Sequence, residues 1–118
     1  MLEYNLWVLL KFLQLGLAGK NVEPAQVTKT YDRAAADYDV NFAIPMSVHT
    51  LPIIDKMQMG NGESLLDLAC GTGMALKYFA DHYKPKTLMG IDMSLGMLQQ
   101  SQKKFDAKQY KNQPIAFI

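Results

Sequence analysis

The clearest pattern in the chain lies between residues 64 and 118, where short apolar runs alternate with longer segments of helical spacing. Three runs predict strands: SLLDLA (64–69), TLMGID (87–92) and PIAFI (114–118). The segments between them, GTGMALKYFADHY (71–83) and SLGMLQQSQKKF (94–105), carry apolar residues three and four positions apart. Strands that alternate with helices of this length predict right-handed crossovers and a parallel α/β sheet.

The first 60 residues predict helices. Residues 27–37 are rich in alanine and favour a helix, with Tyr31 and Tyr38 near one side. Pro45 and Pro52 predict a short turn followed by a helix over residues 52–59, since proline is tolerated in a first turn. The chain therefore divides into an N-terminal helical lid, residues 1–60, and an α/β part, residues 61–118.

Residues 1–18 form an apolar stretch that invites a comparison with membrane segments. It is shorter than the ~20 residues that a span requires, and Glu3 stands where a signal peptide carries basic residues. Its leucines recur at helical spacing and predict an amphipathic helix: Leu6, Leu9, Leu10, Leu13 and Leu17. The apolar face of this helix is expected in internal packing, in a subunit interface or in peripheral contact with a membrane.

Net charge and cysteine content restrict the classes of binding partner and the cellular compartment that we expect for this protein. The formal net charge of +1 provides no field for nucleic acid, so no nucleic-acid partner is expected. Lysines cluster only at the end of the helix over 94–105 and beyond it, which predicts a solvated helix end. The single cysteine, Cys70, excludes an intramolecular disulfide and a cysteine zinc cluster and fits a reducing, cytoplasmic location. No metal site is expected.

The turn after the first strand is the strongest candidate for a binding site. Small residues at Ala69, Gly71 and Gly73 follow Asp67 and let the backbone bend sharply and approach a ligand closely. Ligands of parallel sheets collect at the carboxyl ends of the strands, where the next strand ends in Asp92. A carboxylate in that position suits the hydroxyls of a ribose.

Two common nucleotide motifs do not fit the turn. A dinucleotide fingerprint needs a third glycine where this chain has Leu76 or Met74, depending on the starting residue. A phosphate-binding P-loop fails as well, because no Gly-Lys-Ser/Thr follows.

The segments LLDLACGTG and LMGIDMSLGMLQQSQKK resemble the first two motifs of class I S-adenosylmethionine-dependent methyltransferases, across residues 64–104. The family's first glycine is alanine here. The resemblance implies a Rossmann-like sheet with S-adenosylmethionine as cofactor. It further implies a role for each matching residue: Asp67 toward the methionine ammonium, Ala69, Gly71 and Gly73 under the methionine part, Asp92 on the ribose hydroxyls and Met93 on the adenine.

The segment YDRAAADYD, with Tyr31 and Tyr38, resembles the N-terminal helix that closes over the cofactor in small-molecule methyltransferases. A small-molecule methyl acceptor is therefore expected, while no residue is identified as catalytic. The family's sheet has more strands than the three found here. The chain is thus expected to be the N-terminal part of a longer enzyme and not to be active alone. The alternative function is a non-catalytic module for nucleoside binding or assembly.

Three further expectations concern packing. The first strand becomes an edge of the sheet, which predicts oligomer formation or strand exchange to cover it. Cys70 is expected to be a small buried residue of the turn rather than a reactive thiolate. Core packing is expected for four methionines: Met57, Met74, Met89 and Met97.

Overall fold

A three-stranded parallel sheet forms the centre of the structure. The computed structural model describes residues 10, 13–14, 16–17 and 22–118. Strands β1 (Ser64–Leu68), β2 (Thr87–Ile91) and β3 (Ile115–Phe117) lie in the order β1-β2-β3, and each neighbouring pair is parallel. The predicted α/β fold with a parallel sheet is confirmed.

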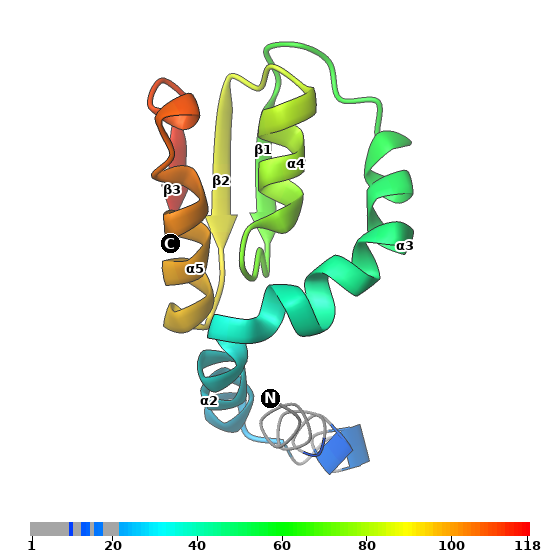
Figure 1. The fold of residues 1–118 in the computed structure, drawn as a ribbon, viewed down its shortest axis with the longest axis vertical. Helices are drawn as coiled ribbons and strands as arrows, with labels where there is room; N and C mark the ends of the chain where they lie inside the picture. Colours follow the sequence, from blue (N-terminus) through cyan, green and yellow to red (C-terminus); the bar gives the residue numbers. More distant parts are fainter. Residues whose placement is uncertain (1–9, 11–12, 15, 18–21) are drawn as a thin grey trace.

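Helices α4 (Met74–His82) and α5 (Leu95–Phe105) pack on one face of this sheet (Figure 1). Leu76 and Phe79 of α4, Leu88 of β2 and Phe105 of α5 are buried in the core between them. Gly90 lets α4 approach β2 closely, because a Cβ there would lie 2.8 Å from Leu76 Cδ1. A short helix, η4 (Lys108–Tyr110), leads from α5 to β3.

A helical segment runs across the carboxyl ends of the strands, toward which the strand arrows point in Figure 1. It comprises α2 (Pro24–Ala34), a 3-10 turn η2 (Ala35–Asp37) and a π turn η3 (Asp39–Ala43). We call residues 24–43 the cap. Ala34 and Ala35 are buried where α2 and η2 contact α5. The helix predicted over residues 27–37 is present and begins earlier, because Pro24 occupies its first turn.

The expected short turn and helix over residues 52–59 are wrong. Helix α3 spans Ile44–Asp55, with Pro45 in its first turn and Pro52 inside it. The backbone of η3 leads directly into α3, so Pro45 needs no break before it. Pro52 removes one internal hydrogen bond without ending the helix. The chain leaves the helix after Asp55 and reaches a left-handed conformation at Gln58.

The edge position predicted for the first strand is confirmed. Among the described residues, no strand pairs with the side of β1 that faces away from β2. Leu66 and Leu68 are 53% and 69% exposed, so the open face of the sheet carries large apolar side chains at this edge.

The predicted amphipathic helix over Leu6–Leu17 falls largely outside the described residues. The positions that are described, among them Leu10, Leu13 and Leu17, are helical and exposed. Within the described part of the chain, no helix is long and apolar enough to cross a membrane.

Candidate functional site

The turn between β1 and α4 has an unusual backbone. Three alternate residues, Ala69, Gly71 and Gly73, have φ angles of 63°, 55° and 75°, in the left-handed region. Glycine enters this region freely, whereas alanine is strained there. The turn therefore needs small residues at these positions for its shape.

The Asp92 carboxylate lies directly against this turn. Its Oδ2 accepts a hydrogen bond of 2.7 Å from the Gly71 backbone N–H, and its Oδ1 accepts one of 2.8 Å from the Ser94 backbone N–H. These bonds fix the carboxylate at the carboxyl ends of β1 and β2. Each oxygen can accept a further hydrogen bond, so Asp92 retains the capacity to bind a diol.

Six of the eight predicted site residues line one pocket of about 210 Å³, which we call the first pocket. Cap side chains form one wall, the glycine turn another, and the segment that leads from β2 into α5 forms the remainder. Its residues are Tyr31, Tyr38, Ala69, Gly71, Asp92, Met93 and Met97. Burial, assisted by Tyr31, Asp92 and Asp39, raises the pKa of Tyr38, which keeps its hydroxyl protonated as a donor.

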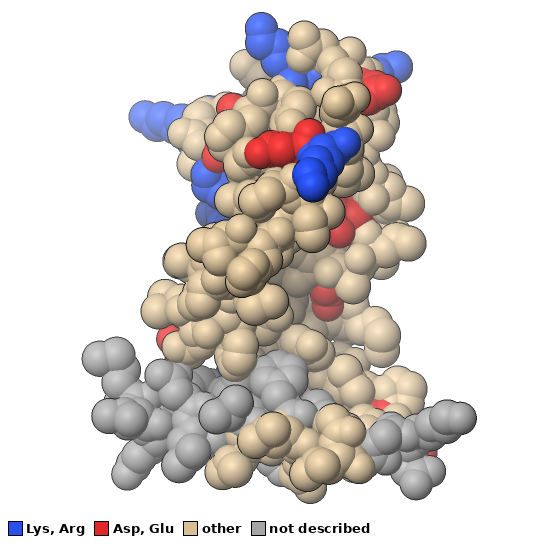
Figure 2. Space-filling model, turned by 90° about the vertical axis from the view of Figure 1, so that its right-hand side faces the viewer, with Lys and Arg blue, Asp and Glu red and all other residues tan. Residues whose placement is uncertain are grey.

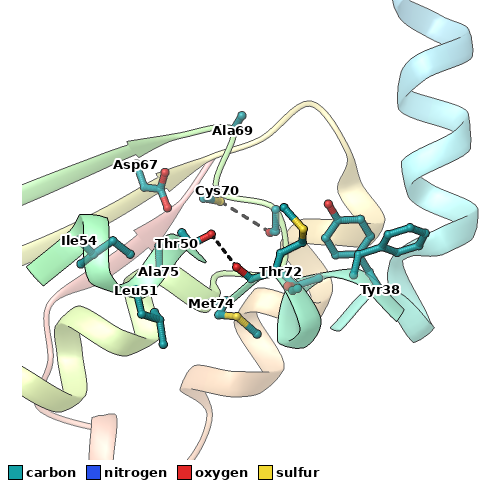
Figure 3. Close-up of a pocket in the computed structure, with 14 residues that line it drawn as sticks. Tyr38, Thr50, Leu51, Ile54, Asp67, Ala69, Cys70, Thr72, Met74 and Ala75 are labelled. Atoms are coloured by element: carbon teal, nitrogen blue, oxygen red, sulfur yellow. Dashed lines mark hydrogen bonds between the residues drawn. The ribbon is translucent and has the colours of Figure 1, made fainter. Parts of the chain in front are cut away.

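Asp67 lies in a second pocket of about 270 Å³, between the turn, α3 and α4 (Figure 3). The two pockets share Tyr38, Ala69 and Gly71. In Figure 3, Leu51 and Ile54 line the second pocket from α3, and Met74 and Ala75 line it from α4. The predicted acids are thus adjacent but belong to different pockets.

Gly73 lines neither pocket. It is the N-cap of α4, and a Cβ there would lie 2.0 Å from Ser101 Oγ of α5. The structure therefore gives Gly73 a packing role, beside the cofactor contact that the sequence predicts.

Cys70 is buried in the turn, and its backbone N–H donates to Ile91 O over 3.0 Å. Burial, with Asp67 and Asp92 nearby, raises the pKa of its thiol to about 11. This agrees with a small buried residue rather than a thiolate. Among the methionines, Met97 is buried and Met74 lines the second pocket, whereas the expectation of core packing is wrong for the exposed Met57 and Met89.

Sequence reasoning missed the side chains that fasten the cap. Asp32 binds the start of α5, and Asp39 binds Thr72 and Lys104. The sequence predicted that Lys104 is a solvated lysine at the helix end. This prediction is wrong, because its ammonium group contacts Asp39. The signal was in YDRAAADYD, where an aspartate follows each of the two tyrosines.

Replacing Ala69 with glycine is expected to stabilise the fold. Glycine adopts the left-handed backbone of this position without strain, and it loses more backbone entropy on folding. We expect Ala69→Gly to raise the free energy of unfolding by about 1 kcal/mol, measured by urea denaturation. Ala75→Gly, inside α4, is the control and should lower it; a loss of stability in Ala69→Gly would contradict this account.

The environment of the Asp67 carboxyl is expected to make the stability of the fold depend on pH. Burial and the nearby Asp92 charge raise the pKa of its carboxyl, so the folded state holds this proton more tightly than the unfolded state. The stabilisation is full below the unfolded pKa and is lost as the pH rises through the folded pKa. We expect Asp67→Asn to be more stable than the wild type at pH 7 and to lose less stability between pH 4 and pH 7. Equal pH profiles from urea denaturation would refute the effect.

The fold and the first pocket together define a class of protein: an α/β domain with a glycine-bearing turn and an acidic strand end at one nucleoside-sized cavity. Comparison with known proteins agrees with this class. Residues 65–117 match the family model described as a methyltransferase domain. The match confirms that this part of the chain resembles class I S-adenosylmethionine-dependent methyltransferases, as its two motifs predict.

Curated relatives include two methyltransferases. Malonyl-[acyl-carrier protein] O-methyltransferase of Marinomonas sp. is 30% identical over 82 residues, which are 70% of this chain and 30% of the relative. Aklanonic acid methyltransferase DauC of Streptomyces sp. is 30% identical over 91 residues, which are 74% of this chain and 40% of the relative. The chain thus spans about a third of the length of these relatives.

A solved structure shares the fold. The S-adenosylmethionine-dependent methyltransferase of Geobacter sulfurreducens, in complex with S-adenosyl-L-homocysteine, superposes with a TM-score of 0.50 at 24% identity. The match covers 58% of this chain and 26% of that chain.

Proposed function

We propose that this chain forms the cofactor-binding half of a small-molecule methyltransferase and binds S-adenosylmethionine in the first pocket. The observation that carries the proposal is the Asp92 carboxylate, which lies against the glycine turn at the carboxyl ends of β1 and β2. S-adenosylmethionine contains a ribose and an amino acid group. The ribose matches the acid at the end of β2, and the amino acid group matches the glycine turn at the end of β1.

Each residue of the first pocket has a physical role in this proposal. Asp92 accepts hydrogen bonds from the ribose hydroxyls, and the exposed Met93 side chain packs on the adenine. Tyr31 and Tyr38 close the pocket from the cap. Asp67 attracts the methionine ammonium from the second pocket, and a cation there favours its ionised form.

S-adenosylmethionine supplies a methyl group already activated by the positive charge on sulfur. The protein then contributes chiefly by holding the acceptor in line with the methyl group and by excluding water. No covalent nucleophile is needed, which agrees with the raised pKa of the Cys70 thiol.

The second pocket suggests an apolar acceptor. Apart from Asp67 and the turn, its lining is dominated by carbon-rich side chains, and only Thr50, Thr72 and Tyr38 add hydroxyls. The apolar residues include Phe42, Met46, Leu51, Ile54 and Met74. By name, the relatives methylate malonyl-[acyl-carrier protein] and aklanonic acid. We therefore propose a small, largely apolar acceptor.

Calorimetric titration of the purified chain with S-adenosylhomocysteine and S-adenosylmethionine tests the cofactor assignment. Saturable binding of both, with no binding of NAD or ATP, is the expected result, because the chain lacks the third glycine and the P-loop lysine of those sites. Absence of binding by both adenosyl ligands would overturn the proposal.

The exposed edge of the sheet favours assembly as a second role. Leu66 and Leu68 lie on the open face of β1. Helix α3 presents Val48 and Ile53 to solvent, and Met57 is exposed just after this helix. Figure 2 looks onto the α3 side of the molecule, where most of the middle of the surface belongs to residues other than lysine, arginine, aspartate and glutamate. We propose that a second copy covers this apolar surface, since patches of this kind mark interfaces.

Sedimentation of the wild type and of Leu68→Lys tests the assembly. We expect a dimer or larger species that dissociates in the variant, while Lys103→Glu, on the exposed side of α5, leaves it intact. A monomeric wild type would refute self-association.

We also propose a cytoplasmic location and peripheral membrane contact through residues 1–18. Cell fractionation of the full chain and of a variant without these residues tests both proposals.

A further inference from the structure

Two carboxylates fasten the cap to the α/β part at separate places. Asp32 Oδ1, on α2, accepts a hydrogen bond of 2.6 Å from Ser94 Oγ and one of 2.8 Å from the Gly96 backbone N–H. Ser94 is the N-cap of α5, so this contact joins α2 to the first turn of α5. Formation of both bonds requires the cap to lie against α5 in one orientation.

Asp39, at the start of η3, makes the second contact. Its Oδ1 accepts a hydrogen bond of 2.5 Å from Thr72 Oγ1, and its Oδ2 lies 2.5 Å from Lys104 Nζ. Lys104 Nζ also donates to the Thr72 backbone carbonyl over 2.5 Å. Thr72 lies in the glycine turn, so this cluster connects the cap, the turn and α5.

The side chains of this cluster are largely withdrawn from water. Lys104 and Asp39 are 20% and 28% exposed, and Thr72 is 2% exposed. Hydrogen bonds between ionised groups are stronger in such surroundings than on an open surface. The cluster is therefore a contact that a solvated lysine and aspartate would not provide.

The backbone leaves little freedom at the first contact. A Cβ on Gly96 would lie 3.0 Å from both Cα and O of Asp32 and 3.1 Å from Ala35 Cβ. Helices α2 and α5 thus approach each other closely enough to require glycine, and Asp32 lies at this point of approach.

Each of the two carboxylates is the chain neighbour of a pocket tyrosine. Tyr31 precedes Asp32, Tyr38 precedes Asp39, and the two rings lie 6.0 Å apart between centroids. Both tyrosines line the first pocket. The positions of these rings are therefore tied to the two carboxylate contacts.

We propose that Asp32 and Asp39, with their partners Ser94, Thr72 and Lys104, are positioning residues that hold the cap closed on the glycine turn before the cofactor binds. This inference rests on the proposed function, in which the pocket between cap and turn takes S-adenosylmethionine. When only a fraction of molecules has the competent conformation, the apparent affinity falls by that fraction. A cap docked in about one molecule in ten would lower it about tenfold.

Asp39→Ala, Lys104→Ala and the double variant test the proposal with two readouts. Amide hydrogen exchange without ligand should accelerate in residues 31–43 of each variant and remain slow in β2 and α5. Affinity for S-adenosylhomocysteine should fall about tenfold in each single variant, and the double variant should be no weaker than either, because one contact is lost in all three. Asp32→Ala, which removes the oxygen that accepts both hydrogen bonds, should show the same effect from the other contact.

Asp37→Ala and Lys103→Ala are matched controls, since both residues are exposed neighbours with no carboxylate or ammonium contact among the described residues. They should match the wild type in both readouts. Unchanged exchange of the cap in Asp39→Ala would overturn the inference, as would additive losses of affinity. If Asp39→Ala does not fold, Asp39→Asn replaces it under the same criteria. A wild type that binds no adenosyl ligand refutes the proposed function, and the exchange measurement still decides whether the carboxylates hold the cap.

Discussion

Asp92→Ala is expected to lower the affinity for S-adenosylhomocysteine by about 100-fold or more. In the proposed complex, the carboxylate accepts two hydrogen bonds from the ribose, and bonds to a charged group contribute about 1.5–3 kcal/mol each. The substitution also frees the N–H groups of Gly71 and Ser94, so the turn loses the bonds that shape it. Both effects lower the affinity for S-adenosylhomocysteine, and calorimetry measures their sum.

Asp106→Ala is the control for charge, since Asp106 is exposed at the end of α5, away from the turn. Its affinity should equal that of the wild type. Circular dichroism should show that Asp92→Ala is folded at the temperature of the titration. Full affinity in folded Asp92→Ala would contradict the assigned role of this residue.

The largest expected effect on stability belongs to Gly73→Ala. A Cβ at this position would lie 2.0 Å from Ser101 Oγ, and its φ of 75° is strained for alanine. Overpacking and backbone strain together are expected to cost about 3 kcal/mol or more of the free energy of unfolding. In a domain whose stability is of the order of 5–15 kcal/mol, this loss is readily measured by urea denaturation.

Gly62→Ala separates strain from overpacking. Gly62 has a φ of 81° and no atom within 4 Å of an added Cβ, so alanine there should cost only about 1 kcal/mol. Ser101→Ala should rescue part of the loss in Gly73→Ala, because the Ser101 hydroxyl is buried without a hydrogen-bond partner among the described residues. Its removal leaves Cβ as the nearest side-chain atom, at 3.2 Å. Equal losses in Gly62→Ala and Gly73→Ala would contradict the packing explanation.

The α/β part could be predicted from the sequence because its determinants are local. Apolar runs separated by helical spacing specify β1, α4, β2 and α5, and the order of the elements specifies parallel pairing. The proximity of Asp92 to the turn followed from the same topology, since neighbouring parallel strands end at one edge.

The remainder depended on contacts between distant residues. Pro52 suggested a helix start, yet the helix that precedes it continues through the proline. Lys104 was expected in solvent, because nothing adjacent to it in sequence indicates Asp39 as its partner. The role of Ser101 against Gly73 is likewise invisible until α5 is packed on the turn.

Comparing S-adenosylhomocysteine with its 2′,3′-dideoxyribose analogue, on the wild type and on Asp92→Ala, tests most directly whether Asp92 holds the ribose. Ligand-observed NMR covers the weak affinities of the variant. We predict that removing the two hydroxyls lowers affinity about 10-fold or more in the wild type and less than about twofold in Asp92→Ala, because the partner is already absent. Equal losses in the two proteins, or no loss in the wild type, would contradict the account.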